Sequence, residues 1–147
     1  MALLLEVYGS TKSKRELINS HTNNIIDILF KEEIYSELDI ILTKSIDADG
    51  YCSGIWLGNS FICEINIDSS LNNDELIKTL AHELYHFKQR YTNKLKYINN
   101  KVIFFHEDVE YTYFDVDITT QLHIDFLWEK EAKEFEEIYF KQIKSDR

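Results

Sequence analysis

Two periodicities alternate along the chain and divide it into strands and helices. In residues 60–68, Phe61, Cys63, Ile65 and Ile67 alternate with more polar positions, as they do in a strand with one buried face. Residues 51–57 precede it across Gly58-Asn59, a dipeptide typical of a two-residue hairpin turn. The pattern predicts a β-hairpin over residues 51–68.

The remaining segments complete an α+β pattern within one domain, residues 1–147. Upstream, we expect strands at 3–8 and 38–42 and, between them, a helix that Ser10 or Ser13 caps and that turns Leu17, Ile18, Ile25, Ile28 and Leu29 inward. Downstream, we expect a hairpin from 95–98 and 101–105, and a third strand over 111–116. No repeat or low-complexity linker indicates a domain boundary.

A helix of period 3.6 is predicted within residues 72–91. The segment opens with the cap candidates Asn72 and Asn73 and has acids in its first turn. Its apolar stripe contains Leu76, Ile77, Leu80, Leu84, Phe87 and Tyr91, and a separate polar stripe contains Glu75, Thr79, His82, His86 and Gln89. Both histidines are therefore expected to point away from the core-facing stripe.

The sequence His82-Glu83-Leu84-Tyr85-His86 places two imidazoles four positions apart on this helix. Residues i and i+4 share a helix face, so both rings can reach one metal ion. Glu83 is displaced about 100° around the helix, where it can meet a water at the metal without being a ligand. This is the H-E-x-x-H arrangement of zinc-assisted hydrolysis, and the alternative is two ordinary histidines around a chance glutamate.

A catalytic zinc site needs a third protein ligand. The metzincin pattern fails, because Gln89 and Thr92 stand where it requires Gly and His. A glutamate from a later helix is the other solution, and residues 125–140 predict such a helix, with Trp128, Ala132, Phe135 and Tyr139 on one stripe. The small Ala132 would allow this helix to approach the first one closely.

Residues 81–89 together with Trp128-Glu129-Lys130-Glu131-Ala132 resemble the small gluzincin-type metallopeptidases of phages and bacteria, and the resemblance extends over roughly residues 51–139. It implies a zincin-like, thermolysin-like core in which the glutamate before the alanine, Glu131, is the third zinc ligand. Relatives often have a proline before the acidic pair, and this chain contains none. The other glutamates of the helix, Glu129, Glu134, Glu136 and Glu137, are expected on a solvated face.

The resemblance also indicates where a substrate would lie. In zincin folds an edge strand binds extended substrate through its free backbone groups, and Ser53, Gly54, Ile55 and Trp56 hold that position. An ordinary protected sheet edge is the alternative. Candidate donors to the oxyanion of the reaction are Tyr111, Tyr113, His106 and His123, and the sequence does not choose among them.

Composition narrows the function classes. The net charge of −10 and the pI near 4.9 disfavour a general nucleic-acid binder. No apolar run approaches a membrane span and Leu3-Leu4-Leu5 lacks the features of a signal peptide, so we expect no membrane partner and a cytoplasmic location, the host cytoplasm if the chain is phage-encoded. Cys52 and Cys63 are then expected as reduced thiols.

The sequence thus predicts a Zn²⁺-dependent endopeptidase that acts on a protein or peptide, with His82, His86 and Glu131 as ligands and Glu83 as general base. A second hypothesis is a Spartan-type protease in which His106 is the third ligand. A third is a binding or regulatory module without catalysis, which a closed shell of four protein ligands would favour.

Overall fold

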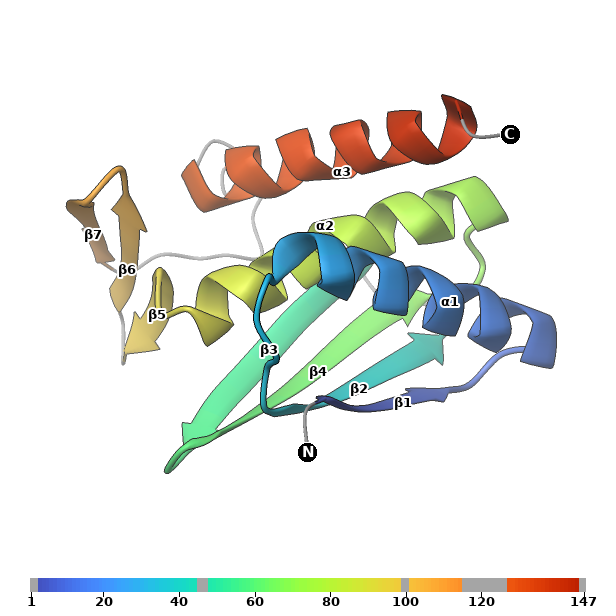
Figure 1. The fold of residues 1–147 in the computed structure, drawn as a ribbon, viewed down its shortest axis with the longest axis horizontal. Coiled ribbons are helices and arrows are strands. Elements are labelled where there is room, and N and C mark those ends of the chain that lie inside the picture. The colour runs from blue at the N-terminus through green and yellow to red at the C-terminus, as the bar shows by residue number, and fades with distance from the viewer. Residues whose placement is uncertain (1–2, 45–47, 99–100, 115–126, 146–147) are drawn as a thin grey trace.

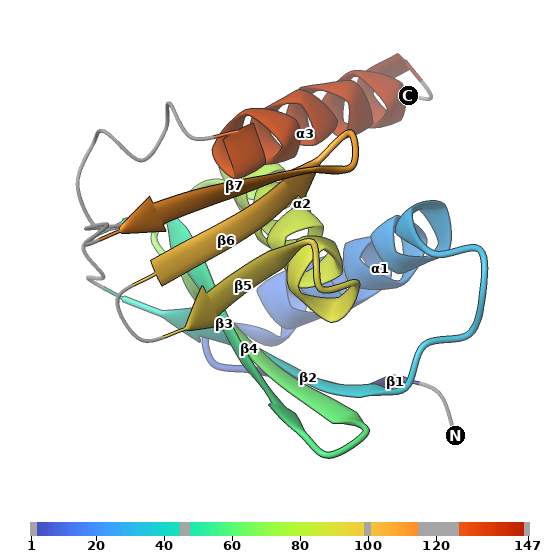
Figure 2. The same cartoon turned by 90° about the vertical axis from the view of Figure 1, so that its left-hand side faces the viewer.

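The computed structural model describes residues 3–44, 48–98, 101–114 and 127–145, and these form an α+β structure (Figures 1 and 2). The described elements, in chain order, are β1 (Leu3–Tyr8), α1 (Lys12–Leu29), β2 (Ser36–Thr43), β3 (Gly50–Leu57), β4 (Ser60–Asp68), α2 (Asn73–Tyr91), β5 (Leu95–Ile98), β6 (Lys101–His106), β7 (Val109–Phe114) and α3 (Leu127–Ser145). They include the hairpins and helices that the sequence predicts. The predicted start of the last helix, residues 125–126, lies outside the described residues.

The larger sheet is mixed and has the strand order β1-β2-β4-β3. Strand β1 pairs parallel with β2, and β2 pairs parallel with β4. Strand β3 pairs antiparallel with β4 through the tight turn at Gly58 and Asn59 and forms one edge of this sheet. Helices α1 and α2 cover one face of the sheet, and α3 lies across α2 on the side away from it (Figure 1).

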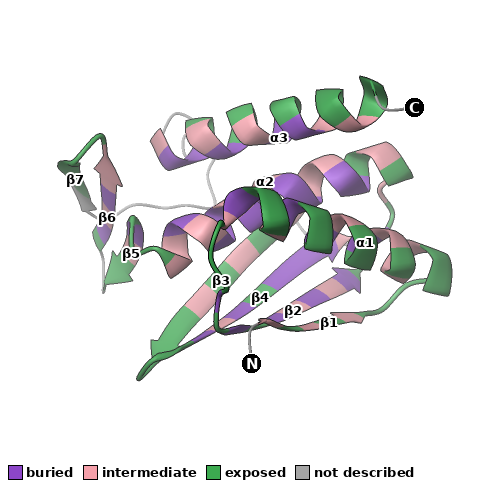
Figure 3. Ribbon diagram, in the orientation of Figure 1, coloured by how far each residue is buried: buried purple, intermediate pink, exposed green. Residues whose placement is uncertain are grey.

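The core lies between this sheet and the two helices that cover it, because the strands alternate buried and exposed positions (Figure 3). Its fully buried members come from strands and helices alike: Ile18, Ile25, Leu38, Ile40, Ile65, Ile67, Leu76, Leu80, Leu84 and Phe87. Of the residues expected on the inner side of α1, Ile28 is 49% exposed, and the cap of that helix is Thr11 rather than Ser10 or Ser13.

A smaller antiparallel sheet, in the order β5-β6-β7, lies beside the C-terminal end of α2 (Figure 2). Its Leu95, Val102 and Phe104 form a second apolar cluster with Trp128, the second residue of α3. This cluster fixes the start of α3 relative to the end of α2. The start of α3 is therefore held over the polar stripe of α2.

Helix α2 begins at a complete capping box, in which Asn72 accepts from the Glu75 backbone and the Glu75 side chain accepts from the Asn72 backbone. Its predicted apolar stripe faces the sheet. The polar stripe, however, is not solvated, since α3 packs over it and leaves His86 and Gln89 buried. None of the helices in the described residues is long and apolar enough to cross a membrane.

Candidate metal centre

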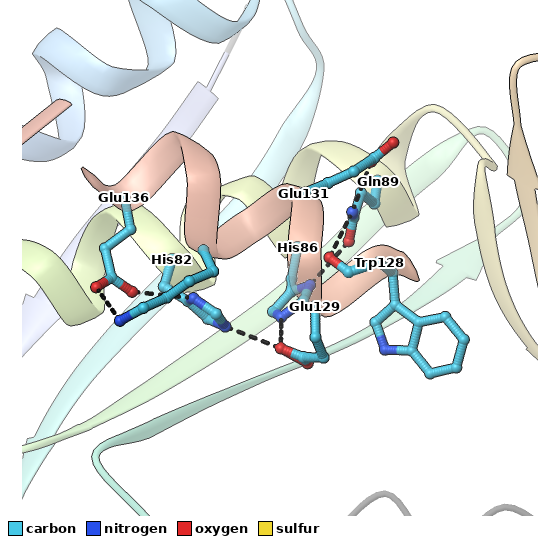
Figure 4. A network of polar contacts seen from close by, with 8 residues as sticks. His82, His86, Gln89, Trp128, Glu129, Glu131 and Glu136 are labelled. Atoms are coloured by element: carbon cyan, nitrogen blue, oxygen red, sulfur yellow. Dashed lines mark hydrogen bonds and ion pairs between the residues drawn. The ribbon is translucent and has the colours of Figure 1, made fainter. Parts of the chain in front are cut away.

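Two imidazoles and one carboxylate converge where α3 packs on α2 (Figure 4). The ring centroids of His82 and His86 lie 4.9 Å apart, as expected for positions i and i+4 of a helix. The Oε1 atom of Glu129 lies 2.9 Å from Nε2 of His82 and 2.8 Å from Nε2 of His86. Within the described residues, this is the group of donors close enough together to hold one metal ion.

The carboxylate that meets the two imidazoles is Glu129 and not Glu131, the residue predicted from the sequence. Residues 129, 132 and 136 lie on one side of α3, whereas residue 131 is rotated by about 200° from residue 129. Ala132 is fully buried against α2, as its small size predicted. The close approach at Ala132 therefore brings Glu129, three positions earlier, to the imidazoles, and not the adjacent Glu131.

Glu129 and Glu136 are only 8% and 7% exposed, so the expectation that both belong to a solvated face is wrong. Glu136 accepts a hydrogen bond of 3.1 Å from Nδ1 of His82, and Lys133 donates to its other oxygen at 2.9 Å. The bond to Nδ1 leaves Nε2 of His82 directed at Glu129. Glu136 therefore orients a candidate ligand without itself joining the group.

Gln89 orients His86 in the same manner. Its Nε2 atom donates to the Trp128 carbonyl at 3.0 Å and to Oε1 of Glu131 at 3.1 Å. With both amide protons committed to these acceptors, Oε1 of Gln89 is left to accept from Nδ1 of His86 at 2.8 Å. Nδ1 of His86 therefore carries a proton, and Nε2 faces Glu129.

Glu131 belongs to this supporting network and not to the donor group. Its second oxygen lies 3.1 Å from Nδ1 of His106 on β6. His106, the third ligand of the Spartan-type hypothesis, likewise lies outside the group formed by His82, His86 and Glu129. Both residues connect the smaller sheet to the donor group through Gln89.

The electrostatics of the donor group are those of a buried ion-pair network. Burial alone would lower the pKa of His82, but its hydrogen bonds to the carboxylates of Glu129 and Glu136 raise that pKa from 6.5 to about 10. Burial opposes ionisation of Glu129, and the hydrogen bonds from His82 and His86 overcome it and lower the pKa of Glu129 well below 4.5. The carboxylate is thus held as an anion, the form that binds metal.

Glu83 lies on the sheet side of α2 beside the donor group and is 5% exposed. Its burial raises its pKa, and the neighbouring His86 and His82 oppose that rise. A Cβ atom placed on Gly50 would lie 3.3 Å from Cγ of Glu83, so the start of β3 packs directly on this side chain. The Oε2 atom of Glu83 is fully buried and has no hydrogen-bond partner among the described atoms.

Strand β3 has one edge paired with β4 and one edge free of the other strands of its sheet. The hairpin closes at the pair Leu57 and Ser60. Backbone bonding to β4 alternates along an antiparallel pair, so Ser53 and Ile55 bond to β4, while the backbone groups of Gly54 and Trp56 face the free edge. The predicted strand is therefore an edge strand, and two of its four residues direct their peptide groups outward.

The remaining sequence candidates are not members of the donor group or lie outside the described residues. Tyr111 is 36% exposed on β7, Tyr113 belongs to the same strand, and His123 lies outside the described residues. Cys52 and Cys63 are free thiols whose sulfur atoms lie 3.4 Å apart. No family model, curated protein or solved structure matches this chain.

Glu129, Glu136 and Gln89 are the residues that the sequence analysis assigned to other roles. One signal for the two glutamates was present: residues 129, 132, 136 and 139 follow helical spacing and include Ala132 and Tyr139 of the predicted apolar stripe. If the predicted stripe had been taken to include Glu129 and Glu136, both residues would have been expected to pack against α2. Gln89 can orient His86 because its amide group is fixed by the Trp128 carbonyl. That contact comes from another helix, so the periodicity of the sequence does not predict it.

Proposed function

We propose that this chain is a zinc-dependent peptide hydrolase of the gluzincin type, in which His82, His86 and Glu129 hold the metal. Two imidazole nitrogens and one carboxylate oxygen are the ligand set of His₂Glu zinc enzymes. Both imidazoles have their second nitrogen engaged, by Glu136 and by Gln89, as zinc ligands almost always do. The donor group therefore fits zinc in both its ligands and their support.

The observation that carries catalysis, as distinct from metal binding, is the Oε2 atom of Glu83. A buried carboxylate oxygen without a partner costs free energy, because it has lost its hydration and gained no hydrogen bond. A protein that needed Glu83 only for packing would be more stable with a neutral residue there. The carboxylate is placed to take a proton from a water beside the donor group and to pass it on to a leaving amine.

Zinc held by these residues would supply Lewis acidity, polarising a substrate carbonyl and lowering the pKa of a water. The chain itself supplies the rest. The outward N–H groups of Gly54 and Trp56 and the Trp56 carbonyl offer an extended peptide hydrogen bonds by β-augmentation, while the Gly54 carbonyl accepts from Arg90. Since Glu83 packs beneath the start of β3, a peptide on this edge would pass near the proton acceptor. A peptide is thus the substrate that the edge strand favours.

The test is the substitution Glu83→Gln, which keeps the shape of the side chain and removes its basicity. The variant should retain zinc, measured by atomic emission, and its thermal unfolding midpoint should not fall and should rise if the buried charge is costly. Its hydrolysis of a fluorescein-labelled unfolded protein should fall by about 10² to 10⁴-fold, the usual contribution of a general base. Glu134→Gln, an exposed change on α3, is the matched control and should leave all three readings unchanged.

A parent protein that binds zinc and cleaves no peptide would contradict the proposed hydrolase. That result would favour the non-catalytic binding module, in which the same donor group serves structure. A Glu83→Gln variant that cleaves as fast as the parent would remove Glu83 from the mechanism while leaving the metal centre in place.

A further inference from the structure

Arg90 extends the line of the two candidate histidine ligands along α2. It lies one helical turn after His86 and two turns after His82, in the last turn of the helix. The two histidines belong to the donor group, and Arg90 lies further along, at the end of α2 where the smaller sheet begins (Figure 1). Its guanidinium is therefore at one end of the proposed centre.

The contacts of Arg90 join the two sheets. One of its terminal nitrogens donates to the Gly54 carbonyl at 3.4 Å, a long bond to an outward-facing group of the free edge of β3. The guanidinium carbon lies 4.2 Å from the centre of the Tyr97 ring on β5. Its contacts are thus a backbone oxygen and the Tyr97 side chain, with which it also shares a hydrogen bond. Its charge also lies close enough to Glu83 to oppose the rise that burial causes in the pKa of that carboxyl.

No carboxylate pairs with Arg90 in the part of the chain that the structure describes. This is unusual for a partly buried guanidinium in a chain with 26 acidic and 16 basic residues. A guanidinium has five N–H donors, and the hydrogen bonds to the Gly54 carbonyl and to the Tyr97 side chain leave others available.

The spacing between Arg90 and Glu83 suits an extended peptide. They are seven positions apart on α2, a rise of about 10 Å. Along β3, the residue beside Glu83 is Gly50 and the residue beside Arg90 is Gly54, about 13 Å apart in a strand. A peptide paired with the free edge would therefore bring a group roughly two to four residues from the scissile bond to Arg90.

We propose that Arg90 forms a subsite for a carboxylate group of the substrate, an inference that rests on the proposed peptide hydrolase. A guanidinium binds a carboxylate through two parallel hydrogen bonds, a planar geometry that an ammonium cannot reproduce. The carboxylate comes either from an acidic side chain or from the C-terminus of the peptide. Substrates of this chain are accordingly peptides with an acidic residue, or a chain end, at a fixed distance from the cut.

Binding is measured first, on the zinc-loaded Glu83→Gln protein, so that the probes are not consumed. The probes are three fluorescein-labelled pools of undecapeptides with mixed neutral residues at the flanking positions. One pool has a central glutamate and an amidated end, one has a central glutamine and an amidated end, and one has a central glutamine and a free C-terminal carboxylate. The expected result is that a pool with a carboxylate binds about tenfold or more tightly than the neutral pool, as a charge-assisted hydrogen bond predicts.

The Arg90→Gln change, made in the same protein, should abolish that preference, and Arg90→Lys should retain part of it. Lys88→Gln is the matched control, because Lys88 shares the last turn of α2 but is directed at the Tyr85 ring. Preference for the glutamate pool identifies a side-chain carboxylate, and preference for the free-acid pool identifies the chain end. Equal binding of the three pools, absence of measurable binding, or an unchanged preference in Arg90→Gln overturns the subsite.

Digestion of a proteome-derived peptide library separates this proposal from the hydrolase on which it rests. The parent should cut at a fixed spacing from an acidic residue or from the peptide end, and Arg90→Gln should cut without that spacing. A parent that cuts with no such spacing overturns the subsite and supports the hydrolase. A parent that cuts nothing, yet binds the carboxylate pools in an Arg90-dependent manner, overturns the hydrolase and supports the subsite.

Discussion

The Oε1 atom of Glu129 lies 2.8 Å from Nε2 of His86, and the same oxygen meets Nε2 of His82. One carboxylate thus faces both imidazoles from an opposing helix. Because the second nitrogen of each ring is held elsewhere, the arrangement is directional and not a chance ion pair. It identifies the residue on α3 whose loss should matter most.

Zinc content should depend on Glu129 and not on Glu131. We expect the parent chain to hold close to one zinc per molecule after dialysis, and Glu129→Gln to lose most of it, because the anionic donor is gone. Glu131→Gln should retain the metal, since this side chain contacts Gln89 and His106. Atomic emission on the purified proteins measures both. Loss of zinc from Glu131→Gln with retention by Glu129→Gln would reverse the assignment.

Gln89 is expected to act through His86. Replacing it by methionine removes the acceptor for Nδ1 while keeping the volume, and should weaken zinc binding about 10 to 100-fold. Nitrogen-15 spectra of the imidazoles should show loss of the fixed proton on Nδ1 of His86, a signature that a merely structural role would not produce. Gln142→Met, on an exposed position of α3, is the control. An unchanged tautomer and affinity in Gln89→Met would contradict the role.

Gly54 should tolerate no side chain. A Cβ atom at this position would lie 2.4 Å from Cζ of Phe61, a fully buried ring that cannot move aside freely. We expect Gly54→Ala to reduce the free energy of unfolding by about 1 to 3 kcal/mol, as overpacking usually does. Urea denaturation measures it. Ser53→Ala, at the neighbouring exposed position, should change stability by about 0.5 kcal/mol or less, and equal effects at both sites would disprove the steric account.

Asp39 lies on the face of the sheet opposite the helices, and we expect its charge to lower the stability of the folded protein in a pH-dependent way. It stands in register between Glu6 and Glu64, and its partial burial and these neighbouring charges raise its pKa above 3.8. A raised pKa in the folded state means that the folded chain holds the proton more tightly than the unfolded chain. Stability is therefore lost as the pH rises through that pKa, and the loss persists at neutral pH.

Asp39→Asn should accordingly stabilise the protein at pH 7, by about 0.2 to 1 kcal/mol for each opposed like charge that is relieved. The gain should vanish below pH 3.8, the unshifted value, where the parent is protonated as well. Thermal unfolding of both proteins between pH 3 and pH 8 provides the measurement. Asp27→Asn, an exposed change on α1, should show no such dependence, and a gain in Asp39→Asn that grows towards acid pH would contradict the sign.

The sequence by itself determined the elements and the first half of the site. Alternation at Phe61, Cys63, Ile65 and Ile67 identified the hairpin, since strand period and burial are properties of neighbouring residues. Helical spacing likewise put His82 and His86 on one face of α2 and identified their polar stripe. These features are local, so short-range periodicity is sufficient to find them.

Only the tertiary structure decided which residues join His82 and His86 in the site. The choice of Glu129 over Glu131 depends on the rotation of α3 about its axis, which the packing of Trp128 against Leu95, Val102 and Phe104 fixes. The supporting contacts from Gln89 and Glu136 arise because α3 covers a helix face that polarity alone marks as solvated. A buried polar side chain needs hydrogen-bond partners that are buried with it. The glutamate partners of His82 and His86 lie more than forty residues away in the chain, so local sequence patterns do not identify them.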